Sequence, residues 1–165
     1  MTNLLQRNIL LDVDSYKISH HALYPKNITG LSSYIESRAP YEEERIVFFG
    51  LQMWIKKNLL TPFTEKDIEE AENFCKEHGE PFNKSGWEYI LEKYNGYLPI
   101  DIYALPEGIV TKSQTPLVVV ECVDPKVFWL ASYIETSLLR GVWYPTTIAS
   151  NDYKNYNMIT KSKKN

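Results

Sequence analysis

The feature that most constrains the fold is a change in hydrophobic period near residue 98. Upstream, two segments that start near Thr64 and Ser85 carry apolar residues at helical spacing and end at Gly79 and Gly96. Downstream, apolar and polar residues alternate over Leu98–Ala104, as they do in a strand with one buried face. The chain is therefore expected to fold as an α+β domain.

Sequence patterns also predict where several helices begin. Thr64 with Asp67 forms a capping-box pattern, and Ser85 with Glu88 repeats it. Apolar residues at helical spacing predict another amphipathic helix over Val47–Leu60.

The strand predictions describe a small antiparallel β meander packed against these amphipathic helices. Its strands are expected at Leu98–Ala104, Ile109–Val110 and Leu117–Val123, with a turn over Thr111–Ser113. Residues 28–36 alternate in the same way and predict one more strand.

A helix is predicted after residue 124, because Asp124 suits the N-cap and Pro125 the first helical position. We expect it to end near Arg140 and Gly141. The predicted organisation is one α/β domain over residues 1–145, followed over 146–165 by a truncated helix start and a polar, lysine-rich tail.

Composition narrows the class of protein. A chain of 165 residues with 44% hydrophobic residues suffices for one domain, and a net charge of -3 gives no global field that would recruit nucleic acid or an anionic membrane. The two cysteines, Cys75 and Cys122, have no disulfide or zinc-site spacing. Because Asp12 and Asp14 interrupt the N-terminal apolar run, a membrane span is not expected, and a cytoplasmic location is.

The stretch Asn8–Pro25 holds the clearest candidate binding residues. Asp14 or Ser15 is suited to cap a short helix that presents Tyr16 and Lys17 at its N-terminal end, where backbone N–H groups and an ammonium attract anions. The ring of Tyr16 is suited to stack on a heteroaromatic ligand. The alternative is an ordinary cap followed by a half-buried tyrosine.

Arg38 follows the strand predicted over residues 28–36 and precedes Pro40, where the proline is expected to end regular secondary structure. Two interpretations stay open. The guanidinium is either a surface charge in a salt bridge or a planar fork for a phosphate or carboxylate.

Several kinds of catalytic motif are missing. The seven glycines are isolated, so no glycine-rich phosphate loop is encoded. His20 and His21 lie beside no obvious catalytic nucleophile or series of carboxylates and are expected at a surface or helix end, while Glu42–Glu44 is expected to be a solvated charge run.

Longer blocks nevertheless resemble one family. The N-terminal part of the nicotinamide phosphoribosyltransferase family is similar to this chain from about Asn8 to Asn151, in order and spacing. The blocks are NILLDVDSYKISHHALYP, YIESR, VFFGLQ, GWEYILEKYNGYLPIDIYALPEG, DPKVFWLASYIETSLL and WYPTTIASN.

The resemblance implies a reaction and a role for three residues. The family makes nicotinamide mononucleotide from nicotinamide and phosphoribosyl pyrophosphate, in an active site at a dimer interface. By resemblance, Tyr16 stacks on the nicotinamide ring across that interface, Arg38 reaches the phosphate side of the ligand, and Asp14 is a supporting polar group. No cofactor is expected on this chain alone, whereas the complete family enzyme is expected to use Mg²⁺ and ATP.

The resemblance also implies what the chain lacks. The family's α/β barrel takes about 200 residues or more, and only residues 142–165 follow Gly141. Neither His20 nor His21 matches the histidine that the family phosphorylates. We therefore expect one wall of an active site, inactive alone and completed by a barrel-bearing polypeptide or a homo-oligomer. The alternatives are a non-catalytic binding or regulatory module that pairs with a full-length relative, and a decayed remnant.

Overall fold

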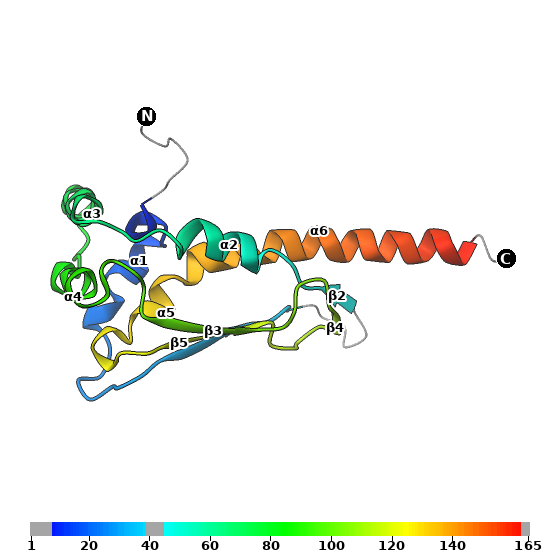
Figure 1. Ribbon diagram of the computed structural model, residues 1–165, viewed down its shortest axis with the longest axis horizontal. Coiled ribbons are helices and arrows are strands. Elements are labelled where there is room, and N and C mark those ends of the chain that lie inside the picture. Colours follow the sequence, from blue (N-terminus) through cyan, green and yellow to red (C-terminus); the bar gives the residue numbers. More distant parts are fainter. Residues whose placement is uncertain (1–7, 39–44, 163–165) are drawn as a thin grey trace.

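The computed structural model describes residues 8–38 and 45–162. A long helix, α6 (Glu135–Ser162), runs above a small sheet, and shorter helices gather at one end of the molecule (Figure 1). The predicted α+β class is confirmed. The predictions for Pro40, Glu42–Glu44 and the last lysines, Lys163 and Lys164, lie outside the described residues.

The helical elements divide into short turns and longer helices. The N-terminal turns are η1 (Ile9–Leu11), α1 (Ser15–Ile18) and η2 (His20–Ala22). The middle of the chain forms α2 (Leu51–Asn58), α3 (Glu65–His78) and α4 (Lys84–Tyr94). The turns η3 (Pro125–Val127) and α5 (Leu130–Tyr133) precede α6.

The strands form two antiparallel sheets. The larger has the order β1-β5-β3, with β1 at Ser32–Ile35, β5 at Val118–Cys122 and β3 at Ile100–Ala104. In the smaller sheet, β2 (Arg45–Val47) pairs with β4 (Val110–Lys112).

The strand order is not the meander that the sequence suggested. β3 pairs directly with β5, and the segment between them leaves to join β2. Phe48 explains the departure, because its carbonyl accepts from the N–H of Gly108 at 2.8 Å and its N–H donates to Ile109 at 3.2 Å. Thr111 and Lys112, expected in a turn, therefore lie in β4.

Caps define α3 as predicted, but not α4. The backbone N–H of Thr64 donates to the Asp67 carboxylate at 2.7 Å, and Gly79 ends α3 with φ +81°. The second predicted box, at Ser85, is wrong. Asn83 caps α4 instead, since its Oδ1 accepts from the N–H of Gly86 at 3.2 Å.

Two other helices, α2 and α6, have bounds that differ from the predicted ones. α2 begins at Leu51 rather than Val47, because Gly50 has φ +108°, which interrupts the helical path. α6 does not end at Gly141 but continues through Pro145. The boundary predicted at residue 145 thus falls inside one helix.

Gly50, Gly141 and Pro145 form a notch where α2 meets α6. Pro145 has no N–H, so the Gly141 carbonyl lacks its usual partner within the helix. A Cβ on Gly50 would lie 2.3 Å from that carbonyl oxygen and 2.9 Å from the Pro145 ring. The missing Cβ of Gly50 therefore allows the two helices to approach closely.

The core beneath the short helices is rich in aromatic rings. Trp87 is fully buried and makes edge-on contacts with Phe63, Trp129 and Tyr133, whose ring centroids lie 5.4, 4.9 and 5.0 Å away. Edge-on packing of this kind stabilises beyond the area it buries. It ties α4 to α5 and to the segment just before α3.

A second tie holds α4 to η3 through a buried carboxylate, Asp124. Its Oδ2 accepts hydrogen bonds at 2.8 Å from Tyr89, Lys93 and Tyr94, and its Oδ1 caps η3 by accepting from the N–H of Lys126 at 2.9 Å. These donors, Lys93 first, hold the pKa of Asp124 well below its usual range. The same pairing raises the pKa of Lys93.

Across residues 8–38 and 45–162, none of the helices, α6 included, combines the length and apolar composition needed to cross a bilayer.

Candidate functional site

The N-terminal ledge (residues 8–17) carries the predicted stacking residue on its surface. Tyr16 lies on α1 with 56% of its side chain exposed. Its ring is tilted against His20, with the centroids 5.3 Å apart, and its hydroxyl lies 3.5 Å from Asp14 Oδ2. One face of an aromatic ring is therefore available at this edge of the molecule.

The ledge is attached to α5 and the first turns of α6 by side-chain contacts. Tyr133 donates to the Leu10 carbonyl at 2.7 Å, within the buried core. On the surface, Arg140 pairs with Asp12.

Asp14 and Lys17, on either side of Tyr16, are held by α6 as well. Thr136 Oγ1 donates to Asp14 Oδ2 at 2.7 Å and accepts from the Asp14 backbone N–H at 3.3 Å. Lys17 pairs with Glu135. The chain is thus fixed before and after the exposed tyrosine.

The prediction that the N-terminal end of α1 attracts anions is wrong. Lys17 is only 5% exposed, and Glu135 neutralises its ammonium. Asp14 occupies the N-cap position, but its carboxylate makes no capping bond and is directed to Thr136. The helix itself is a single turn of four residues, so the ledge presents a ring rather than a positive charge.

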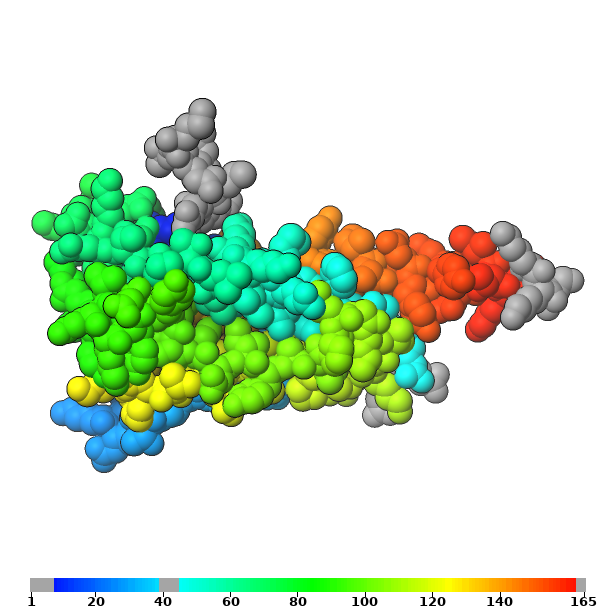
Figure 2. Space-filling view, viewed as in Figure 1, coloured from blue at the N-terminus to red at the C-terminus, as the bar shows by residue number. Residues whose placement is uncertain are grey.

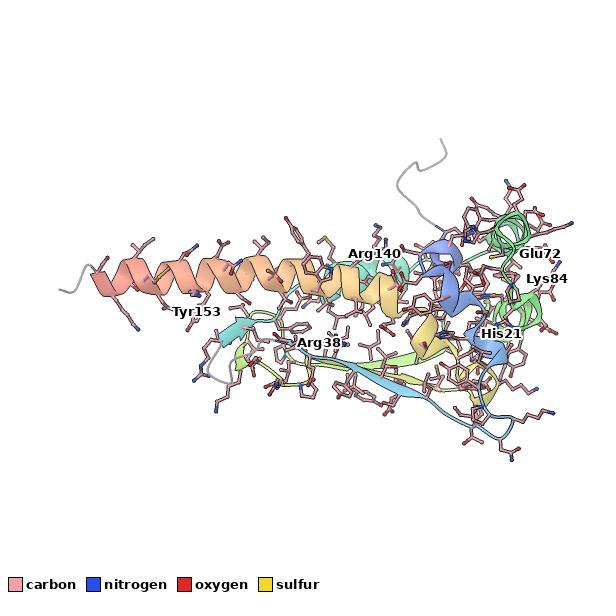
Figure 3. All side chains as sticks on the ribbon, turned by 180° about the vertical axis from the view of Figure 1, so that it is seen from behind. His21, Arg38, Glu72, Lys84, Arg140 and Tyr153 are labelled. Atoms are coloured by element: carbon pink, nitrogen blue, oxygen red, sulfur yellow. The ribbon has the colours of Figure 1, made fainter. Side chains whose placement is uncertain are left out.

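Arg38 lies elsewhere, at a cavity of about 390 Å³ between β1 and the α5–α6 segment. The residue is exposed and follows the end of β1. Val120 and Leu138 are among the apolar lining residues, and Glu36 and Glu135 add carboxylates. Figure 3 shows Arg38 on the sheet side of α6, whereas Arg140 lies on the other side.

The three predicted site residues do not line one common cavity: Arg38 lines one, Asp14 lines another, and Tyr16 lines neither. Tyr16 and Asp14 are neighbours, and Asp14 lines a separate, acidic cavity of about 680 Å³ with Asp12 and Arg140. Glu135 is the link between the two regions, because it pairs with Lys17 and also lines the Arg38 cavity. A ligand contacting both Tyr16 and Arg38 would need further walls.

The part of α6 beyond residue 142 exposes several large apolar side chains among polar ones. Figure 2 shows this part projecting from the body of the molecule. Trp143 is 53% exposed and Tyr144 is 58% exposed. Tyr156 and Ile159, further along, are exposed by 65% and 57%. Exposed aromatic residues in this density are typical of a surface that a partner covers.

Comparison with known proteins identifies the family. The model of the nicotinamide phosphoribosyltransferase N-terminal domain matches residues 8–102. The chain belongs to the nicotinamide phosphoribosyltransferase family. The matched residues include the ledge and Arg38, so both predicted contacts fall inside the family's own N-terminal domain.

Individual relatives agree with this assignment. The nicotinamide phosphoribosyltransferase of Xanthomonas campestris is 45% identical over 143 residues, covering 87% of this chain and 30% of that protein. The Acinetobacter baylyi enzyme of the same name is 30% identical and covers 93% of this chain and 34% of its own length. The chain thus spans about a third of these curated relatives.

A solved structure supports the fold alone. The crystal structure of human nicotinic acid phosphoribosyltransferase superposes with a TM-score of 0.56 at 20% identity, covering 84% of this chain and 26% of that one.

The sequence did not reveal the residues that hold the ledge. Glu135, Thr136 and Arg140 lie in a segment for which the sequence predicts only an amphipathic helix. Thr136 is 122 positions from Asp14. No spacing rule links residues that far apart.

Proposed function

We propose that this chain forms one wall of a nicotinamide phosphoribosyltransferase active site. In the completed site, nicotinamide and phosphoribosyl pyrophosphate yield nicotinamide mononucleotide, a step in NAD biosynthesis. The observation that carries the proposal is the family match over residues 8–102, which includes an exposed Tyr16 on a braced ledge.

Each of the three residues has a physical role in this proposal. Tyr16 stacks on the nicotinamide ring, because its ring is exposed while its backbone is fixed. Arg38 contacts the phosphate side of the ligand with a planar pair of N–H donors. Asp14, whose carboxylate lies 3.5 Å from the Tyr16 hydroxyl, is a supporting polar group of the ledge.

A barrel-bearing polypeptide, or a second subunit that brings a barrel, supplies the other walls. The separation of Tyr16 from the Arg38 cavity supports this part of the proposal, as does the exposed aromatic face of α6 at Trp143 and Tyr144. In this view the site forms at a subunit interface in the cytoplasm, and the chain alone is inactive.

Mg²⁺ and ATP belong to the proposal for the complete enzyme. Within residues 8–38 and 45–162, no group of three or more His, Cys, Asp or Glu side chains is arranged to hold a metal ion. No step is assigned to either group on this chain.

The test supplies in trans the part of the Xanthomonas campestris relative that this chain does not align with. We expect the mixture, and neither component alone, to form nicotinamide mononucleotide. Turnover by this chain without a partner would refute the one-wall proposal. A complex that forms but has no activity would favour a regulatory binding module.

A substitution tests the role of Tyr16 in that mixture. Tyr16→Ala should weaken nicotinamide binding about fivefold or more, since a stacked ring contributes on the order of 1 kcal/mol. Tyr103→Ala is the matched control, because Tyr103 is 58% exposed but lies on β3. Equal affinity of the two variants would exclude Tyr16 from the site.

The role of Arg38 has its own variant. Arg38→Gln should weaken binding of phosphoribosyl pyrophosphate about tenfold, as expected for a lost charge-assisted contact. Arg45→Gln, at an exposed arginine on β2, is the control and should leave affinity unchanged. Similar losses in both variants would indicate a general effect of charge.

A further inference from the structure

We propose that Thr136 is a positioning residue for Tyr16. Its hydroxyl fixes Asp14, two residues before Tyr16, and thereby sets the direction in which the tyrosine ring projects from the surface. This inference rests on the proposed function of Tyr16 and adds a residue on α6 to it.

The first observation is the double contact of one hydroxyl with one residue. Thr136 Oγ1 donates to Asp14 Oδ2 at 2.7 Å and accepts from the Asp14 backbone N–H at 3.3 Å. Two bonds to the same residue restrict both its backbone and its side chain. Asp14 is also the residue from which α1 starts, because the N–H of Lys17 donates to its carbonyl at 2.9 Å.

The second observation is that the Asp14 carboxylate is diverted from its usual use. An aspartate at an N-cap normally accepts from the N–H groups of its own helix. Here it makes no such bond, and the oxygen that contacts Thr136 also lies 3.5 Å from the Tyr16 hydroxyl. The carboxylate therefore lies between the hydroxyl on α6 and the tyrosine of the ledge.

The third observation is that the chain is fixed on the far side of Tyr16 too. Lys17 is buried and paired with Glu135, the residue directly before Thr136. The Tyr16 ring, in contrast, is 56% exposed, and its centroid lies 5.3 Å from that of His20 and 5.8 Å from the Lys17 ammonium nitrogen. A ring whose flanking backbone is already fixed needs less ordering on stacking than a ring on a mobile segment, and preorganisation of this kind increases affinity.

Thr136 is a better test than Glu135. Removing Glu135 would leave the buried Lys17 ammonium without its partner and destabilise the fold. Thr136→Val keeps the shape and β-branching of threonine and removes only the hydroxyl. Asp14 is partly exposed, so water can reach its carboxylate in the variant.

The experiment measures nicotinamide affinity in the mixture with the aligned relative's remaining part. Thr136→Val should weaken binding about threefold or more, as loss of an ordering hydrogen bond predicts. Thr136→Ser, which keeps the hydroxyl, should restore it. Thr147→Val is the matched control on the same helix, because the Thr147 hydroxyl donates to the Trp143 carbonyl at 2.7 Å, away from the ledge.

A double-mutant cycle separates positioning from general stability. In a Tyr16→Ala background, Thr136→Val should cause no further loss, since Thr136 acts through Tyr16. A second loss of the same size would overturn the inference. So would an unchanged affinity of Thr136→Val beside a weakened Tyr16→Ala, and that result would leave the proposed function standing.

Hydrogen exchange in the chain alone gives a readout that does not depend on the partner. The amides of Asp14 and Lys17 should exchange about tenfold faster in Thr136→Val than in Thr147→Val. If Tyr16→Ala binds nicotinamide normally, the proposed function fails. The exchange rates then test, independently of ligand binding, whether Thr136 fixes the backbone next to Tyr16. Equal rates in the two threonine variants would overturn it.

Discussion

The notch between α2 and α6 yields a prediction with an internal control. Gly50 and Gly108 both have a left-handed backbone, with φ of +108° and +86°. A Cβ on Gly108 would meet nothing within 4 Å, whereas a Cβ on Gly50 would lie 2.3 Å from the Gly141 carbonyl oxygen. Comparing Gly50→Ala with Gly108→Ala therefore separates steric contact from backbone strain.

The magnitudes follow from these two terms. A left-handed backbone disfavours alanine by about 1–2 kcal/mol, and this term applies to both variants. At Gly50 the obstacles are a backbone carbonyl and the Pro145 ring, neither of which can rotate away. Overpacking of that kind adds about 1–3 kcal/mol. We expect Gly108→Ala to lose about 1–2 kcal/mol and Gly50→Ala about 2–5 kcal/mol.

Urea unfolding followed by circular dichroism measures both losses. The effect of alanine on the unfolded chain is common to the two variants and cancels in their difference. If the free energy of unfolding falls with urea concentration at the same slope in both variants, the same structure unfolds in each case. If both variants lose the same free energy of unfolding, within about 0.5 kcal/mol, the notch does not hold α2 against α6.

Three further predictions concern the polar cluster, the thiols and α6. Asp124→Asn should lower the free energy of unfolding by about 2 kcal/mol at neutral pH, as loss of charge-assisted hydrogen bonds predicts. Because folding lowers the pKa of Asp124, that difference should shrink as the pH falls below about 4; a constant difference in unfolding measured from pH 7 to 2.5 would contradict the ion-pair account. Burial raises the pKa of the Cys122 thiol to about 11, so iodoacetamide at pH 8 should modify it slowly in the native chain and rapidly in urea. Equal rates by mass spectrometry would show that the thiol is accessible. Replacing both Trp143 and Tyr144 by serine should reduce self-association in sedimentation and the binding of a hydrophobic dye, whereas Tyr103→Ser should not.

Local patterns predicted the elements whose signals lie within a few residues. The box at Thr64 and Asp67, the stop at Gly79 and the cap at Asp124 all operate over one helical turn. The long blocks from Asn8 onward were enough to indicate the family, because they compare residue identity and need no geometry. The exposed ring of Tyr16 was one of the two interpretations that its place in the chain left open.

Tertiary contacts decided the rest. Gly141 was predicted to end a helix, yet α6 continues through it, and Gly50 and Trp54, both far earlier in the chain, pack closely against it. Lys17 looked like an exposed cation, but its partner Glu135 is 118 positions away, and Thr136 meets Asp14 across 122. Periodicity and capping reflect neighbours along the chain, whereas the charge and orientation of the ledge depend on atoms that only folding brings together.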